Sequence, residues 1–184
     1  MQRQAARADD TSLDALAADL RALIDKDDPT AAFLFVAMTM SEKSDRTLRR
    51  RLLLKSASDG CAGAATMLAM DLLESDDPSA LMWAKSAAES GDASAQALLA
   101  GLYRTGKHGI DRDLVEAFAW TKLAERQAYA KAMLPPLQIA ALSIEQALPP
   151  EDKAKAEARA ASLAASIKVA PYYLCGQAAP GRDR

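Results

Sequence analysis

Residues 94–125 read SAQALLAGLYRTGKHGIDRDLVEAFAWTKLAE, and small or apolar residues recur in this stretch at spacings of three and four. Such spacings place the apolar side chains on one face of an α-helix. A polar turn from Gly106 to Asp113 interrupts the pattern once, so the stretch predicts two helices packed as a hairpin. The positions that define the pattern are Ala95, Leu99-Ala100, Tyr103, Gly106, Asp113, Ala117, Trp120 and Leu123-Ala124.

The same pattern returns twice upstream, at intervals of 31 and 32 residues. The equivalent positions of the nearer copy are Ala64, Leu68-Ala69, Leu72, Ala80, Trp83, Ala87-Ala88 and Gly91. Those of the farther copy are Ala32, Val36-Ala37, Met40, Arg49, Leu52, Ser56-Ala57 and Gly60. Half a unit precedes them, with Ala17, Leu20, Ile24 and Asp28. Repetition at such a period is typical of solenoids. The predicted fold is therefore all-α, a right-handed α/α superhelix made of a short row of antiparallel helix pairs.

The pattern divides the chain into a solenoid and a cap. The solenoid spans residues 12–132, as a half unit (12–31) and three units (32–63, 64–94 and 95–131). The register stops at Pro135-Pro136, and two further helices, at about 136–147 and 151–167, are predicted to form a C-terminal capping pair within residues 133–170. Residues 1–11 and 171–184 are predicted to be disordered. Gly60 and Gly91 are expected to end their helices in the left-handed conformation.

The composition agrees with helices and excludes several classes of protein. Alanine, the best helix former, makes up 42 of the 184 residues. A formal net charge of −2 and a pI near 5.5 argue against a general nucleic-acid binder, which is normally basic. The longest apolar run, residues 31–38, is far shorter than the roughly 20 residues that span a bilayer, so no membrane span is expected.

The N-terminal sequence and the cysteines bear on the cellular setting. Residues 1–10 contain no apolar segment typical of a secretory signal, so the expected location is the cytoplasm, or the periplasm if the chain has been trimmed. Cys61 and Cys175 lie more than a hundred positions apart and suggest no disulfide framework. We therefore expect a reduced setting, with Cys61 packed as a small residue at a turn.

Few residues suggest chemistry. His108 is the single histidine and is expected to be solvated in the longest turn. Neither CxxC nor HExxH spacing occurs, so the sequence predicts no metal site, no cofactor and no enzymatic activity. Residues 46–55, with Arg49, Arg50 and Arg51, form the one strong charge cluster. They are interpreted either as a solvated helix face or as a patch for an acidic protein partner. Nucleic acid is disfavoured because no aromatic residues are interleaved.

The unit at residues 94–125 resembles a Sel1-like repeat, whose pattern is approximately A-x-x-x-L-G-x-x-Y-x-x-G-x-G-V-x-x-D-x-x-x-A-x-x-W-x-x-x-A-A. The matching positions are Ala95, Leu99, Tyr103, Gly106, Gly109, Ile110, Asp113, Ala117, Trp120 and Ala124. Ala100 replaces the family glycine, and the unit at 32–63 departs furthest, with Arg49 in a small-residue position and Leu52 in the tryptophan position. The resemblance covers about residues 12–132. It implies a tetratricopeptide-like solenoid with adaptor or regulatory work in bacterial signalling, envelope processes or host interaction.

If these hairpins stack as tetratricopeptide-like units do, the first helix of each pair lines a concave groove. The residues of these helices that the hairpin contacts leave unused are Leu34, Met38, Glu42, Thr66, Met70, Glu74, Arg104 and Thr105. They are predicted to bind a partner, because methionine surfaces adapt to varied partners. The alternative is that the methionines are ordinary core residues.

The sequence thus predicts a non-enzymatic module that binds a peptide or a protein surface on its concave face, as a monomer or a weak homodimer. Two alternatives stay open. The first is an immunity-type or toxin-neutralising binder that uses the loop at 106–113 or the basic patch at 46–55. The second is a regulatory domain of a larger bacterial protein.

Overall fold

The computed structural model describes residues 14–39, 45–128, 131–167 and 175, and the regular structure within these ranges is helical. Residues 14–24 form a first helix. The helices after it are α2 (Pro29–Thr39), α3 (Arg46–Ser58), α4 (Ala62–Leu73), α5 (Ala80–Glu89), α6 (Ala93–Thr105), α7 (Leu114–Gln127), α8 (Leu134–Ala147) and α9 (Pro150–Ser166). A 3₁₀ turn, Lys131–Met133, leads into α8. The predicted all-α class is confirmed.

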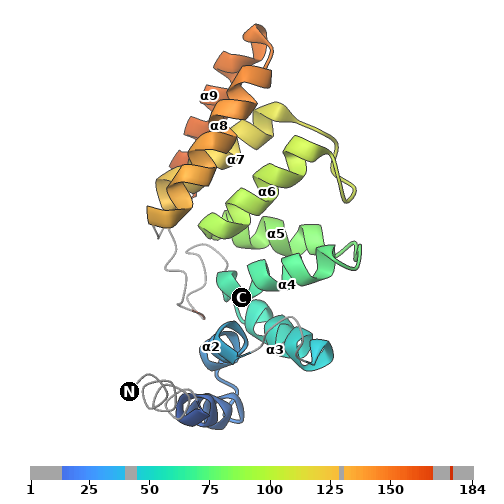
Figure 1. Ribbon diagram of the computed structural model, residues 1–184, viewed down its shortest axis with the longest axis vertical. Helices are drawn as coiled ribbons and strands as arrows, with labels where there is room; N and C mark the ends of the chain where they lie inside the picture. The colour runs from blue at the N-terminus through green and yellow to red at the C-terminus, as the bar shows by residue number, and fades with distance from the viewer. Residues whose placement is uncertain (1–13, 40–44, 129–130, 168–174, 176–184) are drawn as a thin grey trace, which may run out of the picture.

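Consecutive helices pack as hairpins, and the hairpins stack along the long axis of the molecule (Figure 1). α2 pairs with α3, α4 with α5 and α6 with α7. The second helix of each pair also packs on the first helix of the next pair. The arrangement is the α-solenoid that the sequence repeats predict.

Carboxylates begin several helices, and glycines follow the ends of two of them. Asp45, Asp92 and Asp113 are the N-cap residues of α3, α6 and α7, and each side chain accepts a hydrogen bond from a backbone N–H of the first turn. Gly60 and Gly91 follow α3 and α5 with φ of +89° and +91°. Both glycines thus take the left-handed conformation that the sequence predicts for them.

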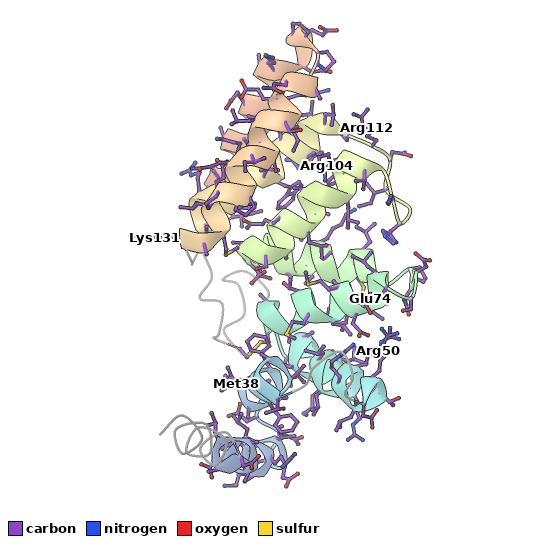
Figure 2. The ribbon with its side chains drawn as sticks, viewed as in Figure 1. Met38, Arg50, Glu74, Arg104, Arg112 and Lys131 are labelled. Carbon is purple, nitrogen blue, oxygen red and sulfur yellow. A yellow bond between two sulfur atoms is a disulfide. The ribbon has the colours of Figure 1, made fainter. Side chains whose placement is uncertain are left out.

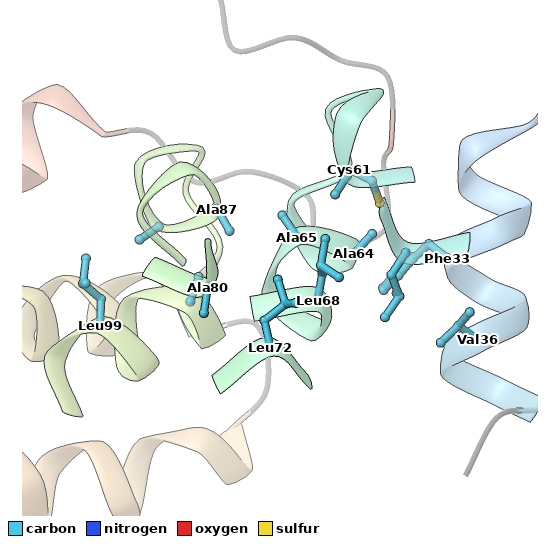
Figure 3. Close-up of a cluster of buried hydrophobic side chains, with 14 of the residues drawn as sticks. Phe33, Val36, Cys61, Ala64, Ala65, Leu68, Leu72, Ala80, Ala87 and Leu99 are labelled. Carbon is cyan, nitrogen blue, oxygen red and sulfur yellow. The ribbon is translucent and has the colours of Figure 1, made fainter. Parts of the chain in front are cut away.

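The core is a strip that runs between the helices. Most of the alanines at the repeated positions are buried, and several have no exposed surface, among them Ala64, Ala69, Ala84, Ala88, Ala95 and Ala117. A side chain of one methyl group leaves little bulk between two packed helices. Figure 3 shows Leu68 of α4 between Phe33 of α2 on one side and Ala80 of α5 on the other. Each hairpin therefore buries its apolar face mainly against its neighbours.

The last two helices both pack on α7. A second apolar cluster joins the three helices, and its buried members are Val115, Ala117, Phe118, Ile144, Leu148 and Ala156. Beside this cluster, the Glu116 carboxylate accepts hydrogen bonds from the Trp120 indole at 3.0 Å and from Arg159 of α9 at 2.7 and 3.3 Å. The α8–α9 pair thereby covers the C-terminal end of the stack.

The expectation of two unlinked, reduced cysteines is wrong in this structure. Cys61, the residue before α4, forms a disulfide bond with Cys175 across 114 positions of sequence. The large separation of the two cysteines in sequence led to this expectation, but it carries no information on where Cys175 lies in space. Of the segments predicted to be disordered, residues 1–11, 171–174 and 176–184 lie outside the described ranges.

Candidate functional site

The first helices of the hairpins are the predicted lining of a concave groove. α4 and α6 contact each other directly, although α5 lies between them in sequence. In a curved stack of helix pairs, helices on the concave side approach one another most closely. We therefore take α2, α4 and α6 as the helices that line the concave face.

Two methionines occupy equivalent repeat positions on these helices. Met38 of α2 and Met70 of α4 lie 32 residues apart and are 48% and 50% exposed. Figure 2 shows Met38 on α2, with its side chain at the surface of the stack. The next position in this series is Gly101 of α6, which has no side chain. Their exposure excludes the alternative that these methionines are ordinary core residues.

The other predicted surface residues lie near the C-terminal ends of α4 and α6. Glu74, Arg104 and Thr105 are exposed (Figure 2 labels the first two). Leu34 is half-buried against the main core. Glu42 lies outside the described residues. The exposed residues of α2, α4 and α6 thus include an apolar part around the methionines and a charged part at the helix ends.

The prediction that Thr66 lines the groove is wrong, because its side chain is buried against the start of α6. Its hydroxyl lies 2.9 Å from Oδ1 of Asp92 and 3.0 Å from the Ala62 carbonyl oxygen. The same Oδ1 accepts the Ala95 N–H at 2.7 Å. Burial raises the pKa of the Asp92 carboxyl above its ordinary value, and these hydrogen bonds oppose the rise without cancelling it. Thr66 therefore holds two hairpins together and contacts no partner.

Two of the four arginines of α3, Arg49 and Arg50, face α4 instead of solvent. Arg49 and Arg50 both bond to the carboxylate of Asp71, and Arg50 also donates to the Asp71 carbonyl oxygen at 2.9 Å. Arg46 lies 3.6 Å from the same carboxylate and pairs with Glu74. Arg50 and Glu74 are seen at the same end of α3 and α4 in Figure 2. We call this cluster, Arg46, Arg49, Arg50 and Asp71, the arginine clasp.

The arginine clasp changes the interpretation of the basic patch at 46–55. The side chains of Arg49 and Asp71 are only 10% and 4% exposed, so both charges are largely removed from water. Burial acts to raise the pKa of Asp71, but the hydrogen bonds and charges of Arg50 and Arg49 outweigh it and hold the pKa below its ordinary value. For Arg49 and Arg50, both predicted roles, a solvated face and a patch for a partner, are wrong.

The loop between α6 and α7 contacts the loop between α4 and α5. His108 Nδ1 lies 3.0 Å from Asp76 Oδ1, and His108 is exposed to solvent in this loop, as predicted. Gly106 ends α6 with φ of +65°, and a Cβ there would lie 3.0 Å from the backbone nitrogen of Arg112. Ile110 is buried beneath the loop. The loop therefore presents a defined surface.

The described residues contain no group of three or more His, Cys, Asp and Glu side chains able to hold a metal ion. A shallow hollow at the start of α3 is lined by Asp45, Thr47, Leu48 and Arg51. Its carboxylate, that of Asp45, accepts the N–H groups of Thr47 and Leu48 as the helix cap, so it is committed to structure. Separately, none of the described helices has both the length and the apolar character needed to cross a membrane.

Asp71 and Asp92 are the important residues that sequence reasoning missed. A signal for the first existed, because Arg49 stands in an alanine position of the repeat and Asp71 interrupts the apolar run MLAMDLL at 67–73. Two charged exceptions on neighbouring helices, of opposite sign, indicate a buried ion pair. No comparable signal marks the contact between Thr66 and Asp92.

No protein-family model matches this sequence, and no curated protein matches it either. Among solved structures, the fold is similar to that of a protective antigen present in uropathogenic Escherichia coli strains, which displays a Sel1-like repeat fold. The TM-score is 0.74 at 22% sequence identity, and the match covers 82% of this chain. The chain spans only about a third of that antigen, since 33% of it is covered. The comparison shows the Sel1-like repeat fold.

Proposed function

We propose that this solenoid is a non-enzymatic interaction module that binds a peptide or a protein surface on the concave face of α2, α4 and α6. The main support is the pair of half-exposed methionines, Met38 and Met70, in register on two neighbouring helices. Their flexible thioether side chains form an adaptable apolar contact for a partner.

Charged residues near the apolar part give the partner an orientation. Glu74 lies one turn beyond Met70 on α4, and Arg104 lies in the last turn of α6. Side chains of opposite charge at neighbouring helix ends form a polar rim, which contributes to specificity and to the rate of association more than to affinity.

The hairpins behind this face are held in place before any partner arrives. The arginine clasp fixes α3 on α4, and the contact of Thr66 with Asp92 fixes α4 on the start of α6. A surface that is already ordered loses little conformational entropy on binding. The fold therefore supports binding by a preorganised face.

The loop at 106–113 supports a second candidate, an immunity-type or toxin-neutralising binder. Its exposed surface contacts the neighbouring loop through His108 and Asp76, and Ile110 is buried beneath it. The patch at 46–55 does not support this candidate, since Arg49 and Arg50 are bonded to Asp71. A regulatory domain of a larger protein also stays a proposal, and the partial coverage of the longer antigen is its support.

Affinity capture with matched variants tests the concave face. Met38→Glu and Met70→Glu put a charge on the proposed apolar contact while keeping a good helix former. Each is expected to lower the yield of the specifically captured partner by about tenfold, equivalent to about 1.4 kcal/mol of binding free energy, with unchanged helical circular dichroism. Met82→Glu is the control, because Met82 is 57% exposed on α5, a second helix of its hairpin.

The outcomes separate the two candidates. Retained capture by Met82→Glu together with loss in the two concave variants supports the proposal. Unchanged capture by a protein carrying both concave substitutions contradicts it. A loss confined to Lys107→Glu, in the exposed part of the loop, favours the loop candidate instead.

A further inference from the structure

The disulfide between Cys61 and Cys175 ties the segment after α9 to the middle of the stack. Cys61 lies between α3 and α4, whereas Cys175 comes nine residues after the end of α9. In a solenoid each unit contacts only its neighbours. A covalent bond that encloses α4 to α9 is therefore a feature that the repeat itself does not need.

Cys61 replaces a capping residue. At the starts of α2 and α6, Asp28 and Asp92 each accept the N–H three residues ahead, at 2.9 and 2.7 Å. Cys61 stands at the N-cap of α4, and its side chain makes no capping hydrogen bond. Carboxylates at this position stabilise a helix, and cysteine gives up that stabilisation. Cys61 thus contributes its sulfur atom to the cross-link and no capping hydrogen bond to α4.

The bond lies beneath the surface, where α3 leads into α4. Cys61 is 1% exposed and Ser56 of α3 is fully buried. The sulfur of Cys175 lies 4.0 Å from the Ser56 hydroxyl, which donates to the Pro29 carbonyl oxygen at 2.7 Å. Cys175 also packs, partly buried, against the main core. The disulfide thus fills a site built by the ends of three helices.

The chain just after α9 has an anchor of its own on a different hairpin. Gln127 of α7 donates to the Ile167 carbonyl oxygen at 3.0 Å, and its own side-chain oxygen accepts a hydrogen bond from Gln96 of α6 at 2.7 Å. Ile167 is therefore fixed on α6 and α7, and Cys175 on α3 and α4. Ile167 and Cys175, only eight residues apart in sequence, thus contact different parts of the stack.

We propose that Cys61 and Cys175 form a redox latch. Oxidation closes residues 61–175 into one covalent ring and holds Cys175 at the α3–α4 junction. Reduction breaks the S–S bond and releases Cys175, while the helices stay folded through their own packing. This latch is independent of the partner-binding proposal, since it concerns the bond between Cys61 and Cys175 and not the exposed methionines.

A small-molecule disulfide can serve as the oxidant that closes the latch. Two thiols lose two protons and two electrons as the S–S bond forms, and oxidised glutathione takes them up to become two glutathione thiols. A dithiol reductant runs the step backwards. Because disulfides persist in oxidising compartments, the latch is closed outside a reducing cytoplasm. This runs against the cytoplasmic location expected from the N-terminal sequence.

Tryptic mapping of the full chain tests the bond directly. After incubation with oxidised glutathione, residues 56–85 and 169–182 are expected as one disulfide-linked peptide, and dithiothreitol should separate them. Titration in denaturant should find no free thiol before reduction and two after it. Two free thiols in the oxidised protein, or a bond between two chains, would overturn the proposal.

Hydrogen exchange and thermal unfolding test whether breaking the disulfide changes the local stability of the folded protein. Reduction or Cys175→Ser should speed amide exchange at the start of α4 and lower Tm by about 5–15 °C, while helical circular dichroism at 25 °C is retained. Cys61→Asp combined with Cys175→Ser restores a capping carboxylate, so it separates the lost bond from a weakened helix start.

Each outcome of these measurements either supports or contradicts the redox latch. Faster exchange and lower Tm in a folded, reduced protein and in the recapped variant support the latch. Equal exchange and Tm in the oxidised and reduced forms contradict it. A reduced protein that unfolds at 25 °C also contradicts it, because the bond is then a requirement for folding.

Discussion

The carboxylate of Asp71 lies between two guanidinium groups in the interior of the solenoid. A buried ion pair adds little stability relative to apolar packing, because removing both charges from water costs about as much as their attraction returns. Once such a pair is present, however, loss of one partner leaves the other charge buried and uncompensated. Asp71 is therefore the single residue whose charge matters most to the contact between α3 and α4.

Asp71→Asn should lower the free energy of unfolding by about 3 kcal/mol, because the substitution keeps the shape of the side chain but removes the negative charge that Arg49 and Arg50 both bind. Urea denaturation at pH 7 measures the change. Glu74→Gln is the matched control, since Glu74 and Arg46 are both more than half exposed and such pairs contribute about 0–1 kcal/mol. Equal losses in the two variants would contradict the arginine clasp as described.

The same variant tests the pH dependence. The pKa of Asp71 is lower in the folded protein than in the unfolded chain, so its stabilisation is present at neutral pH and disappears as the pH falls through the folded-state pKa. The difference between parent and Asp71→Asn should therefore shrink below about pH 4. The carboxyl of Asp92 has a raised pKa and acts with the opposite sign, favouring the folded state as the pH falls.

At the scale of helices, the glycines that end them differ in how closely other groups approach. Gly60 and Gly106 both have positive φ, but only a Cβ at Gly106 would meet another residue, at 3.0 Å from the Cβ and backbone nitrogen of Arg112. Gly60→Ala should cost about 1–2 kcal/mol for the left-handed conformation. Gly106→Ala should cost a further 1–3 kcal/mol, because Arg112 belongs to the backbone of the next loop and must move. Denaturation curves of the two variants check this order, and equal costs would refute it.

The helices themselves are predictable from the sequence, and their contacts only in part. The spacing of apolar residues and the glycines at 60 and 91 define where helices run and end. Periodicity shows that a helix face is covered, but it does not say which neighbour covers it. For this reason Thr66 is predicted at the surface but lies against Asp92, and Arg49 is predicted to face solvent or a partner but lies against Asp71.

At the scale of the whole molecule, the cap and the solenoid share one core through α7. Ile144→Ala should lower the free energy of unfolding by about 2–4 kcal/mol, because Ile144 is 2% exposed between α8 and α7. Ile139→Ala on the same helix is the control, at 68% exposure, and should change stability by less than about 0.5 kcal/mol. Calorimetry should show one transition shifted in the first variant. A second, separate transition would mean that the cap unfolds on its own.

The repeats reveal the stack, but they carry no information on the chain beyond the last repeat. Cys61 and Cys175 belong to a unit and to a tail that share no register, so no spacing rule could pair them. The concave face shows the same limit in another form. The repeat predicts that Met38 and Met70 belong to it, whereas their degree of exposure depends on how closely the hairpins pack.

The arginine clasp also restricts how this array could be lengthened. Thr39 holds the place in α2 that Asp71 holds in α4, and Leu102 holds it in α6. If the unit at 32–63 were duplicated in tandem, Arg49 and Arg50 of the first copy would face a threonine instead of the Asp71 carboxylate that both now bind. The contact between α3 and α4 is therefore specific to these two helices. Extending the array by duplication would require a copy of Asp71 together with the arginines that bind it.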